Sequence, residues 1–229
     1  MSVIRFRPLN ADRFPIVIPE NGSRHAYRTL LETLGSGVAA VDIDLDECPD
    51  ILISGGGDFR DRRAVPKPLS LLRNLDQCFV DVTGASGMPA TRFYSHGLAT
   101  IDVDHDGFPD ALLTGYGGIQ LFRNCGDGTF EDRTSASGLN ISTWCSSAAW
   151  GDFNLDGEPD LFVPGYVDWS FDNDPPCYTP DGAVRDTCSP KLFQPLPDHL
   201  FLSHGDGTWS DETENSDYVR TARDLSSGS

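Results

Sequence analysis

The sequence predicts an all-β fold, and three observations support that prediction. Short apolar runs rich in Val, Ile, Leu and Phe recur along the chain. Gly, Asp, Asn and Pro bound these runs, and such residues form the turns between strands. The same order of runs and turns returns three times, so the chain is built from copies of one supersecondary unit.

The first half of each copy places an Asp-rich loop between two apolar runs. The three loops begin at equivalent aspartates, namely Asp42, Asp102 and Asp152. They are 60 and 50 residues apart, close to the length of a four-stranded propeller blade.

The second half of each copy adds two more apolar runs, which predicts four short strands per copy. These halves cover the ranges Leu71–Thr83, Leu121–Thr134 and Leu200–Thr213. In the second and third copies Gly-Asp-Gly separates the runs, and it indicates a tight turn because Gly readily adopts positive φ.

We therefore expect β-propeller-type blades of four antiparallel strands. The expected parts are the first blade at 37–88, the second at 97–139, and the third at 147–213 with an insertion at 164–199. Residues 1–36 would supply one or two N-terminal strands, and residues 214–229 a tail or the start of a further blade. A closed propeller has about four to eight blades, so three recognisable blades would be a fragment of one.

The composition restricts the partners. Thirty-five acidic residues against 17 basic ones give a formal charge of -18, which disfavours nucleic acid and anionic membranes and favours cations. No stretch approaches the roughly 20 apolar residues of a membrane helix, so we expect no membrane insertion. The first 21 residues lack the apolar core of a signal peptide.

The Asp loops predict up to three Ca²⁺ sites. Side-chain oxygens stand at loop positions 1, 3, 5 and 9, on Asp42, Asp44, Asp46 and Asp50, on Asp102, Asp104, Asp106 and Asp110, and on Asp152, Asn154, Asp156 and Asp160. Calcium takes about six to eight oxygen ligands, and a Gly at position 6 permits the sharp turn of such a loop. By analogy with other calcium loops, position 7 would add the backbone carbonyls of Cys48, Phe108 and Glu158.

The Asp loops have three other possible interpretations, namely an EF-hand, a magnesium site and solvated turns. An EF-hand would need a bidentate Glu at position 12, where this chain has the apolar Ile53, Leu113 and Val163. Magnesium usually keeps several waters and avoids all-protein cages. The simplest alternative is that the loops are solvated Asp-rich turns without a metal. The occurrence of the same loop at equivalent positions of three copies disfavours it.

The three sites are expected to differ in affinity. The second loop has four Asp ligands and Gly107, so it should bind calcium most tightly. Asn154 removes one negative charge from the third loop, and Glu47 stands in the first loop where positive φ is expected.

Three segments of the sequence resemble the FG-GAP/VCBS (integrin-alpha-type) calcium-binding propeller repeats, and within them proteins similar to cartilage acidic protein that carry ASPIC/UnbV-type repeats. The segments are Leu31–Val38, Leu121–Phe130 and Cys188–Pro195. The resemblance implies a seven-bladed propeller, calcium in the blade loops, and an extracellular or envelope location. The chain departs from it at Glu47 and in lacking Gly-Asp-Gly after Asn74.

Two cysteines predict a disulfide. Cys177 and Cys188 lie in the polar, Pro-rich insertion, which has little core of its own to hold it together. Their pairing would favour an oxidising environment, so we expect an extracellular, periplasmic or cell-surface protein. Cys48, Cys78, Cys125 and Cys145 have no assigned partner.

No catalytic constellation is recognisable among the five histidines and the remaining carboxylates. We therefore expect no enzyme but a calcium-binding scaffold for adhesion or for an unknown protein or glycan ligand. The alternative is the non-catalytic propeller part of a larger secreted hydrolase or oxidoreductase. Trp150 and Trp209 are expected in the core, and Trp169 in a ligand contact.

Overall fold

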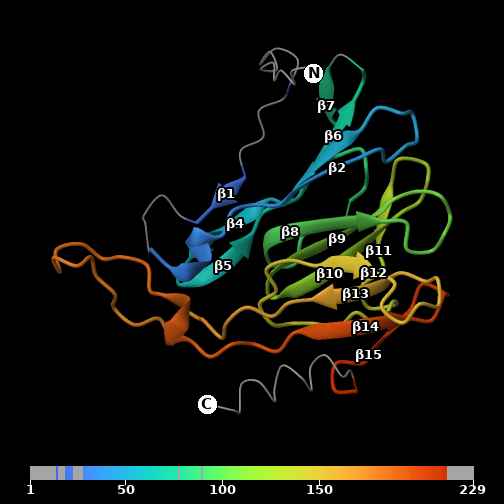
Figure 1. Ribbon diagram of the computed structural model, residues 1–229. Coiled ribbons are helices and arrows are strands. Elements are labelled where there is room, and N and C mark those ends of the chain that lie inside the picture. The colour runs from blue at the N-terminus through green and yellow to red at the C-terminus, as the bar shows by residue number, and fades with distance from the viewer. Residues whose placement is uncertain (1–13, 15–18, 23–27, 77, 89, 216–229) are drawn as a thin grey trace, which may run out of the picture.

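The computed structural model describes residues 14, 19–22, 28–76, 78–88 and 90–215, and these are almost entirely β. They form four sheets (Figure 1). The helical segments among them are two short 3-10 turns, Leu30–Thr33 and Pro190–Leu192. The predicted all-β fold is thus confirmed.

Three sheets are blades of four antiparallel strands in chain order. The first blade contains β2 (Val38–Val41), β3 (Asp50–Ile53), β6 (Ser70–Asn74) and β7 (Phe79–Asp81). The second contains β8 (Tyr94–Ile101), β9 (Asp110–Tyr116), β10 (Gly118–Asn124) and β11 (Phe130–Asp132). The third contains β12 (Ala149–Gly151), β13 (Asp160–Val163), β14 (His199–Ser203) and β15 (Trp209–Asp211). Four strands per copy were predicted, and the sheets confirm them.

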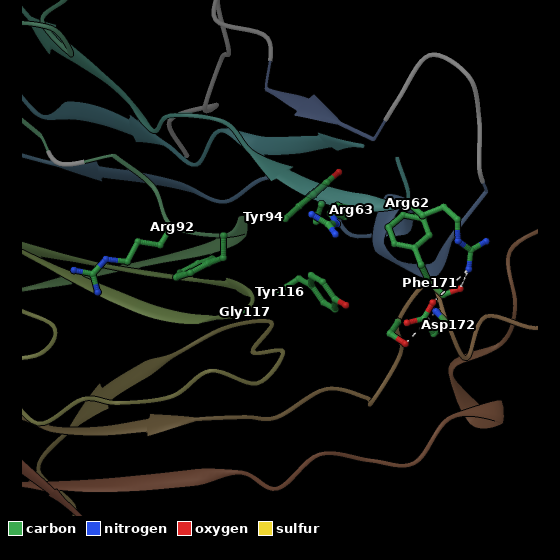
Figure 2. A pocket seen from close by; sticks show the side chains of 11 residues that line it. Arg62, Arg63, Arg92, Tyr94, Tyr116, Gly117, Phe171 and Asp172 are labelled. Atoms are coloured by element: carbon green, nitrogen blue, oxygen red, sulfur yellow. Dashed lines mark hydrogen bonds and ion pairs between the residues drawn. The ribbon is translucent and has the colours of Figure 1, made fainter. Parts of the chain in front are cut away.

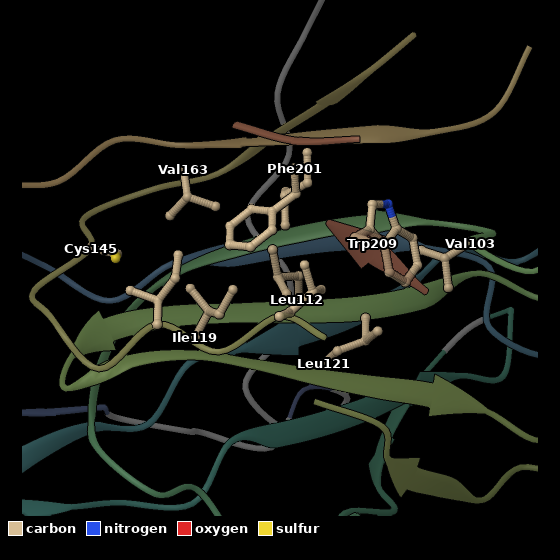
Figure 3. Packing of buried hydrophobic residues seen from close by; sticks show 11 residues of the cluster. Val103, Leu112, Ile119, Leu121, Cys145, Val163, Phe201 and Trp209 are labelled. Atoms are coloured by element: carbon tan, nitrogen blue, oxygen red, sulfur yellow. The ribbon is translucent and has the colours of Figure 1, made fainter. Parts of the chain in front are cut away.

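The second blade lies between the other two, and its β8 contacts both β2 and β12. Neighbouring residues of its strands pack into different cores, because successive side chains of a strand point to opposite faces. Leu113 and Phe122 face the first blade, whereas Leu112 and Leu121 face the third. Figure 3 shows the core between the second and third blades, to which the second blade contributes Leu112 and Leu121 and the third contributes Phe201.

The fourth sheet was not foreseen from the sequence. A hairpin of β4 (Gly56–Arg60) and β5 (Arg63–Pro66) is inserted between β3 and β6, and β1 (Glu20–Asn21) pairs parallel to β4. One or two strands were expected within residues 1–36. The apolar stretches there at 4–7 and 16–18 lie outside the described residues, as does the tail beyond residue 215.

The insertion at 164–199 packs on the molecule through an aromatic cluster, which includes Trp144, Trp169 and Phe171. Trp169 is only 2% exposed, and its indole N–H donates to Asp174 Oδ1 at 2.9 Å. The expected role of Trp169 as a ligand contact is therefore wrong, because the ring is covered by this cluster. Trp209 is buried as predicted, and the half-buried Trp150 packs against the same core.

The predicted disulfide is confirmed between Cys177 and Cys188, whose Cα atoms are 5.3 Å apart. The four other cysteines are free thiols. The described part of the chain contains no helix of the length and apolarity required to cross a bilayer.

Candidate metal centres

The three Asp loops lie at the same end of the blades. Each joins the first strand of a blade to the second, so they follow β2, β8 and β12, and they emerge together at the right of Figure 1. The second and third loops are in contact, because His105 Nε2 of the second lies 3.0 Å from Glu158 Oε2 of the third.

The position 1 aspartates hold the loops in their curled form. Asp102 accepts hydrogen bonds from the backbone N–H of Asp106 at 3.2 Å and of Gly107 at 2.8 Å. Asp42 and Asp152 accept the two equivalent bonds in their own loops. One carboxylate therefore organises each turn, and the same geometry arises three times from the same sequence position.

Positive φ angles complete the curl. At position 6 they are 69° for Glu47, 93° for Gly107 and 94° for Gly157, which confirms the left-handed conformation expected at Glu47. The non-glycine residues at position 4 also have positive φ, namely Leu45, His105 and Leu155. That second strained position was not predicted, and its cost is about 1 kcal/mol per residue.

The position 9 aspartates are buried clamps between strands. Asp110 is 1% exposed and accepts backbone N–H bonds from Val103 at 2.9 Å and Asn124 at 2.7 Å. Asp50 and Asp160 accept corresponding pairs of bonds. Burial raises the pKa of Asp110 to about 7, with Asp104 and Asp106 adding to the rise while the two amide donors oppose it.

Carboxylates converge in two of the three loops. Oxygens of Asp42, Asp44 and Asp50 lie within 4.8 Å of one another, and so do those of Asp102, Asp104 and Asp106. Since calcium–oxygen distances are about 2.3 to 2.6 Å, two ligands of one ion are at most about 5 Å apart. Both groups fit that requirement, although Asp46 and Asp110 do not belong to them.

The third loop brings fewer acids together. Asn154 replaces an aspartate, and its amide Nδ2 donates to Asp156 Oδ2 at 2.7 Å. Its Oδ1 accepts from the Asp156 N–H at 3.1 Å. The third loop therefore keeps the backbone geometry of the other two with one fewer carboxylate.

Two arginines next to the loops were missed by the sequence analysis. Arg123 donates from Nε to Asp104 Oδ2 at 2.5 Å and from Nη2 to Asp106 Oδ2 at 2.6 Å. Arg73 contacts the equivalent aspartates through one nitrogen only, because its Nη2 touches Asp44 Oδ2 and lies 3.7 Å from Asp46 Oδ2, while its Nε has no hydrogen-bond partner among the described residues. The signal was present, because the two arginines occupy the same repeat position, which is Leu202 in the third copy.

A family comparison agrees with this architecture. Residues 69–163 match the family model of the FG-GAP-like repeat. The matched segment runs from the third strand of the first blade to the second strand of the third blade, and it includes two of the Asp loops. No curated protein matches the chain. The matched segment is thus an FG-GAP-type repeat, while the resemblance to ASPIC/UnbV-type proteins depends on sequence motifs alone.

Proposed function

We propose that this protein is a calcium-binding repeat scaffold that presents a binding surface to a protein or glycan ligand outside the cytoplasm. The observation that carries the proposal is the convergence of three carboxylates within 4.8 Å in each of two loops. The FG-GAP-type repeat supports an interaction or scaffold role. The Asp-loop residues described above need only bind a cation for that role.

Calcium would be held by side chains at positions 1, 3 and 5 and by the position 9 aspartate, which also joins the loop to the third strand. Each carboxylate oxygen that accepts a backbone N–H retains a lone pair for a metal. The bound ion would supply positive charge to carboxylates that otherwise repel one another. One end of each blade would then be stiffened, and the opposite end would remain free to contact a partner.

The confirmed disulfide supports a location in an oxidising compartment, because cytosolic thiols are kept reduced. The high negative charge is compatible with extracellular calcium, which is available at millimolar concentration. The proposed function therefore includes adhesion and a location outside the cytoplasm.

Calcium-dependent stability tests the proposal. At about 2 mM calcium and a dissociation constant of about 0.1 mM, linkage predicts about 1.8 kcal/mol of stabilisation per site. We expect the melting temperature to rise with calcium, to fall after chelation, and to respond much less to magnesium.

Matched variants make this test specific. Asp46→Ala, Asp106→Ala and Asp156→Ala should each remove one calcium-binding step in a calorimetric titration. Asp127→Ala is the control, because Asp127 lies in an exposed Gly-Asp-Gly turn outside the Asp loops. If chelation leaves the melting temperature unchanged, the loops are solvated turns and the proposal is wrong.

A further inference from the structure

The end of the blades opposite the Asp loops has different chemistry. It is built by the connections between second and third strands, which are the β4–β5 hairpin, the β9–β10 turn and the insertion at 164–199. They enclose a hollow of about 360 Å³ whose lining includes Arg62, Arg63, Tyr116 and Phe171 (Figure 2). This hollow is separate from every residue of the candidate metal centres.

The tip of the hairpin concentrates positive charge in a strongly acidic protein. Arg60, Arg62 and Arg63 fall within four consecutive residues, although the whole chain has only 17 basic residues and a formal charge of -18. Such a concentration creates a local positive potential that attracts anions to this site.

Two of these arginines lie opposite each other on the hairpin, and no described carboxylate neutralises their positive charges. Arg60 and Arg63 are directly paired across the hairpin, and like charges in that arrangement destabilise a strand pair. In the described part of the chain, no carboxylate lies within ion-pair distance of either guanidinium, and both side chains are exposed. An anion between them would remove the repulsion.

The third arginine holds the hairpin tip against the insertion. Arg62 donates to the backbone carbonyl of Phe171, and its guanidinium carbon lies 5.7 Å from the centre of the Phe171 ring. Its Nη2 also lies 3.9 Å from Asp172 Oδ1, an exposed carboxylate at the edge of the hollow, so the charge of Arg62 is compensated and only Arg60 and Arg63 are left to bind an anion. The turn residues Asp61 and Arg62 have φ of 49° and 57°, a conformation that favours Asn or Gly. The contacts with Phe171 thus keep a strained, basic turn in one place beside the hollow.

The walls of the hollow are aromatic. Tyr116 is half-buried at its rim, and Phe93 and Phe171 are buried beneath the surface. Arg92 also lines it but is compensated by Asp132 at 2.6 Å. The uncompensated charge of Arg60 and Arg63 therefore lies on the hairpin, near the half-buried ring of Tyr116, which is the aromatic side chain in this wall that a sugar ring could contact.

We propose that this hollow, together with the adjoining surface of the hairpin lined by Arg60 and Arg63, binds a uronic-acid-containing glycan through its carboxylate, and we call the two together the hairpin pocket. Guanidinium groups pair with carboxylates in a planar, bidentate manner. A densely charged polyanion would be repelled by the rest of the surface, whereas a glycan with one carboxylate in every second sugar carries far less charge. The proposal names the ligand class for the interaction role proposed above and does not depend on calcium binding.

The test is a calorimetric titration of the full chain with a hyaluronan tetrasaccharide, which alternates glucuronate and N-acetylglucosamine. We expect binding to the wild type and at least tenfold weaker binding to Arg63→Gln and to Arg60→Gln. The neutral tetramer of N-acetylglucosamine should bind at least tenfold more weakly to the wild type. Arg133→Gln is the matched control, because Arg133 is an exposed arginine away from the hairpin pocket and should leave the affinity unchanged.

Several results would overturn the proposal. They are equal affinity of wild type and Arg63→Gln, tighter binding of an oligo-glutamate peptide, or equally tight binding of inorganic sulfate. Each titration is repeated after chelation, and calcium-induced melting shifts are measured on the same variants. Unchanged shifts without glycan binding would reject the hairpin pocket alone, while glycan binding without shifts would reject the calcium sites alone.

Discussion

The second and third Asp loops share a backbone but differ at loop position 3 and in the side chain that the third strand places beside the loop. In both, the position 1 aspartate accepts the same two N–H bonds, and the position 9 aspartate joins the loop to the third strand. At position 3 the second loop has Asp104 and the third has Asn154. On the third strand, Arg123 of the second blade corresponds to Leu202.

These two differences compensate each other. At positions 1, 3, 5 and 9 together with the facing residue of the third strand, four aspartates and Arg123 give the second loop three net negative charges, and three aspartates give the third loop the same number. Glu158, at position 7 of the third loop, is outside this count and lies 3.0 Å from His105 of the second. The same carboxylate oxygen also receives a donor in both sites. Arg123 Nη2 lies 2.6 Å from Asp106 Oδ2, and Asn154 Nδ2 lies 2.7 Å from Asp156 Oδ2.

If both loops bind calcium as proposed, the number of aspartates alone would not determine their relative affinities. The sequence analysis expected the second site to be the tightest because it has one more carboxylate. With Arg123 included, we now expect the second and third sites to have similar affinities.

The largest effect should come from the part that the two loops share. Asp110→Ala and Asp160→Ala each leave two backbone N–H groups without their acceptor, so each should lower the calcium-free unfolding free energy by about 2 to 5 kcal/mol. Urea denaturation measures this, with Asp127→Ala as a surface control expected within about 0.5 kcal/mol of wild type. If only one of the two variants lost stability, the position 9 aspartates would not have the same structural role in both blades.

A smaller effect should follow from removing the arginine. Arg123→Leu adds one net negative charge to the second site, so its calcium affinity should rise about tenfold. Because Asp104 and Asp106 then lack their counterion, the calcium-free protein should lose about 1 kcal/mol of stability, a modest value since Arg123 is partly exposed. Calcium titration and urea denaturation check both parts, with Arg133→Leu as the control. Weaker calcium binding in Arg123→Leu would mean that the arginine orients the ligands rather than opposing the cation.

The smallest effect should come from converting one loop into the other. Asp104→Asn combined with Arg123→Leu gives the second site the chemistry of the third, so its affinity should stay within about threefold of wild type. The single variant Asp104→Asn should bind more weakly than the double variant, because Arg123 would then face one carboxylate fewer. A double variant that binds calcium as weakly as the single Asp104→Asn variant would show that Arg123 does not oppose the cation.

The four strands of each blade, the repeat, the Asp loops and the disulfide could be predicted from the sequence alone, whereas the β4–β5 hairpin could not. Strand and turn patterns are local, so the alternation that sends Leu112 and Leu113 into opposite cores could be predicted without knowing what those cores contain. The position of Glu47 was likewise sufficient to predict its positive φ.

Contacts between side chains that are far apart in the sequence could be identified only in the folded structure. Arg123 is 19 residues from Asp104, and their pairing depends on how β10 lies against the loop between β8 and β9. Trp169 became buried because the insertion folds back onto Trp144 and Tyr116. The hairpin pocket likewise requires segments from the first, second and third blades to lie together. Such contacts follow from the stacking of complete blades, because burial and charge pairing depend on all neighbours of a side chain and not on its sequence neighbours alone.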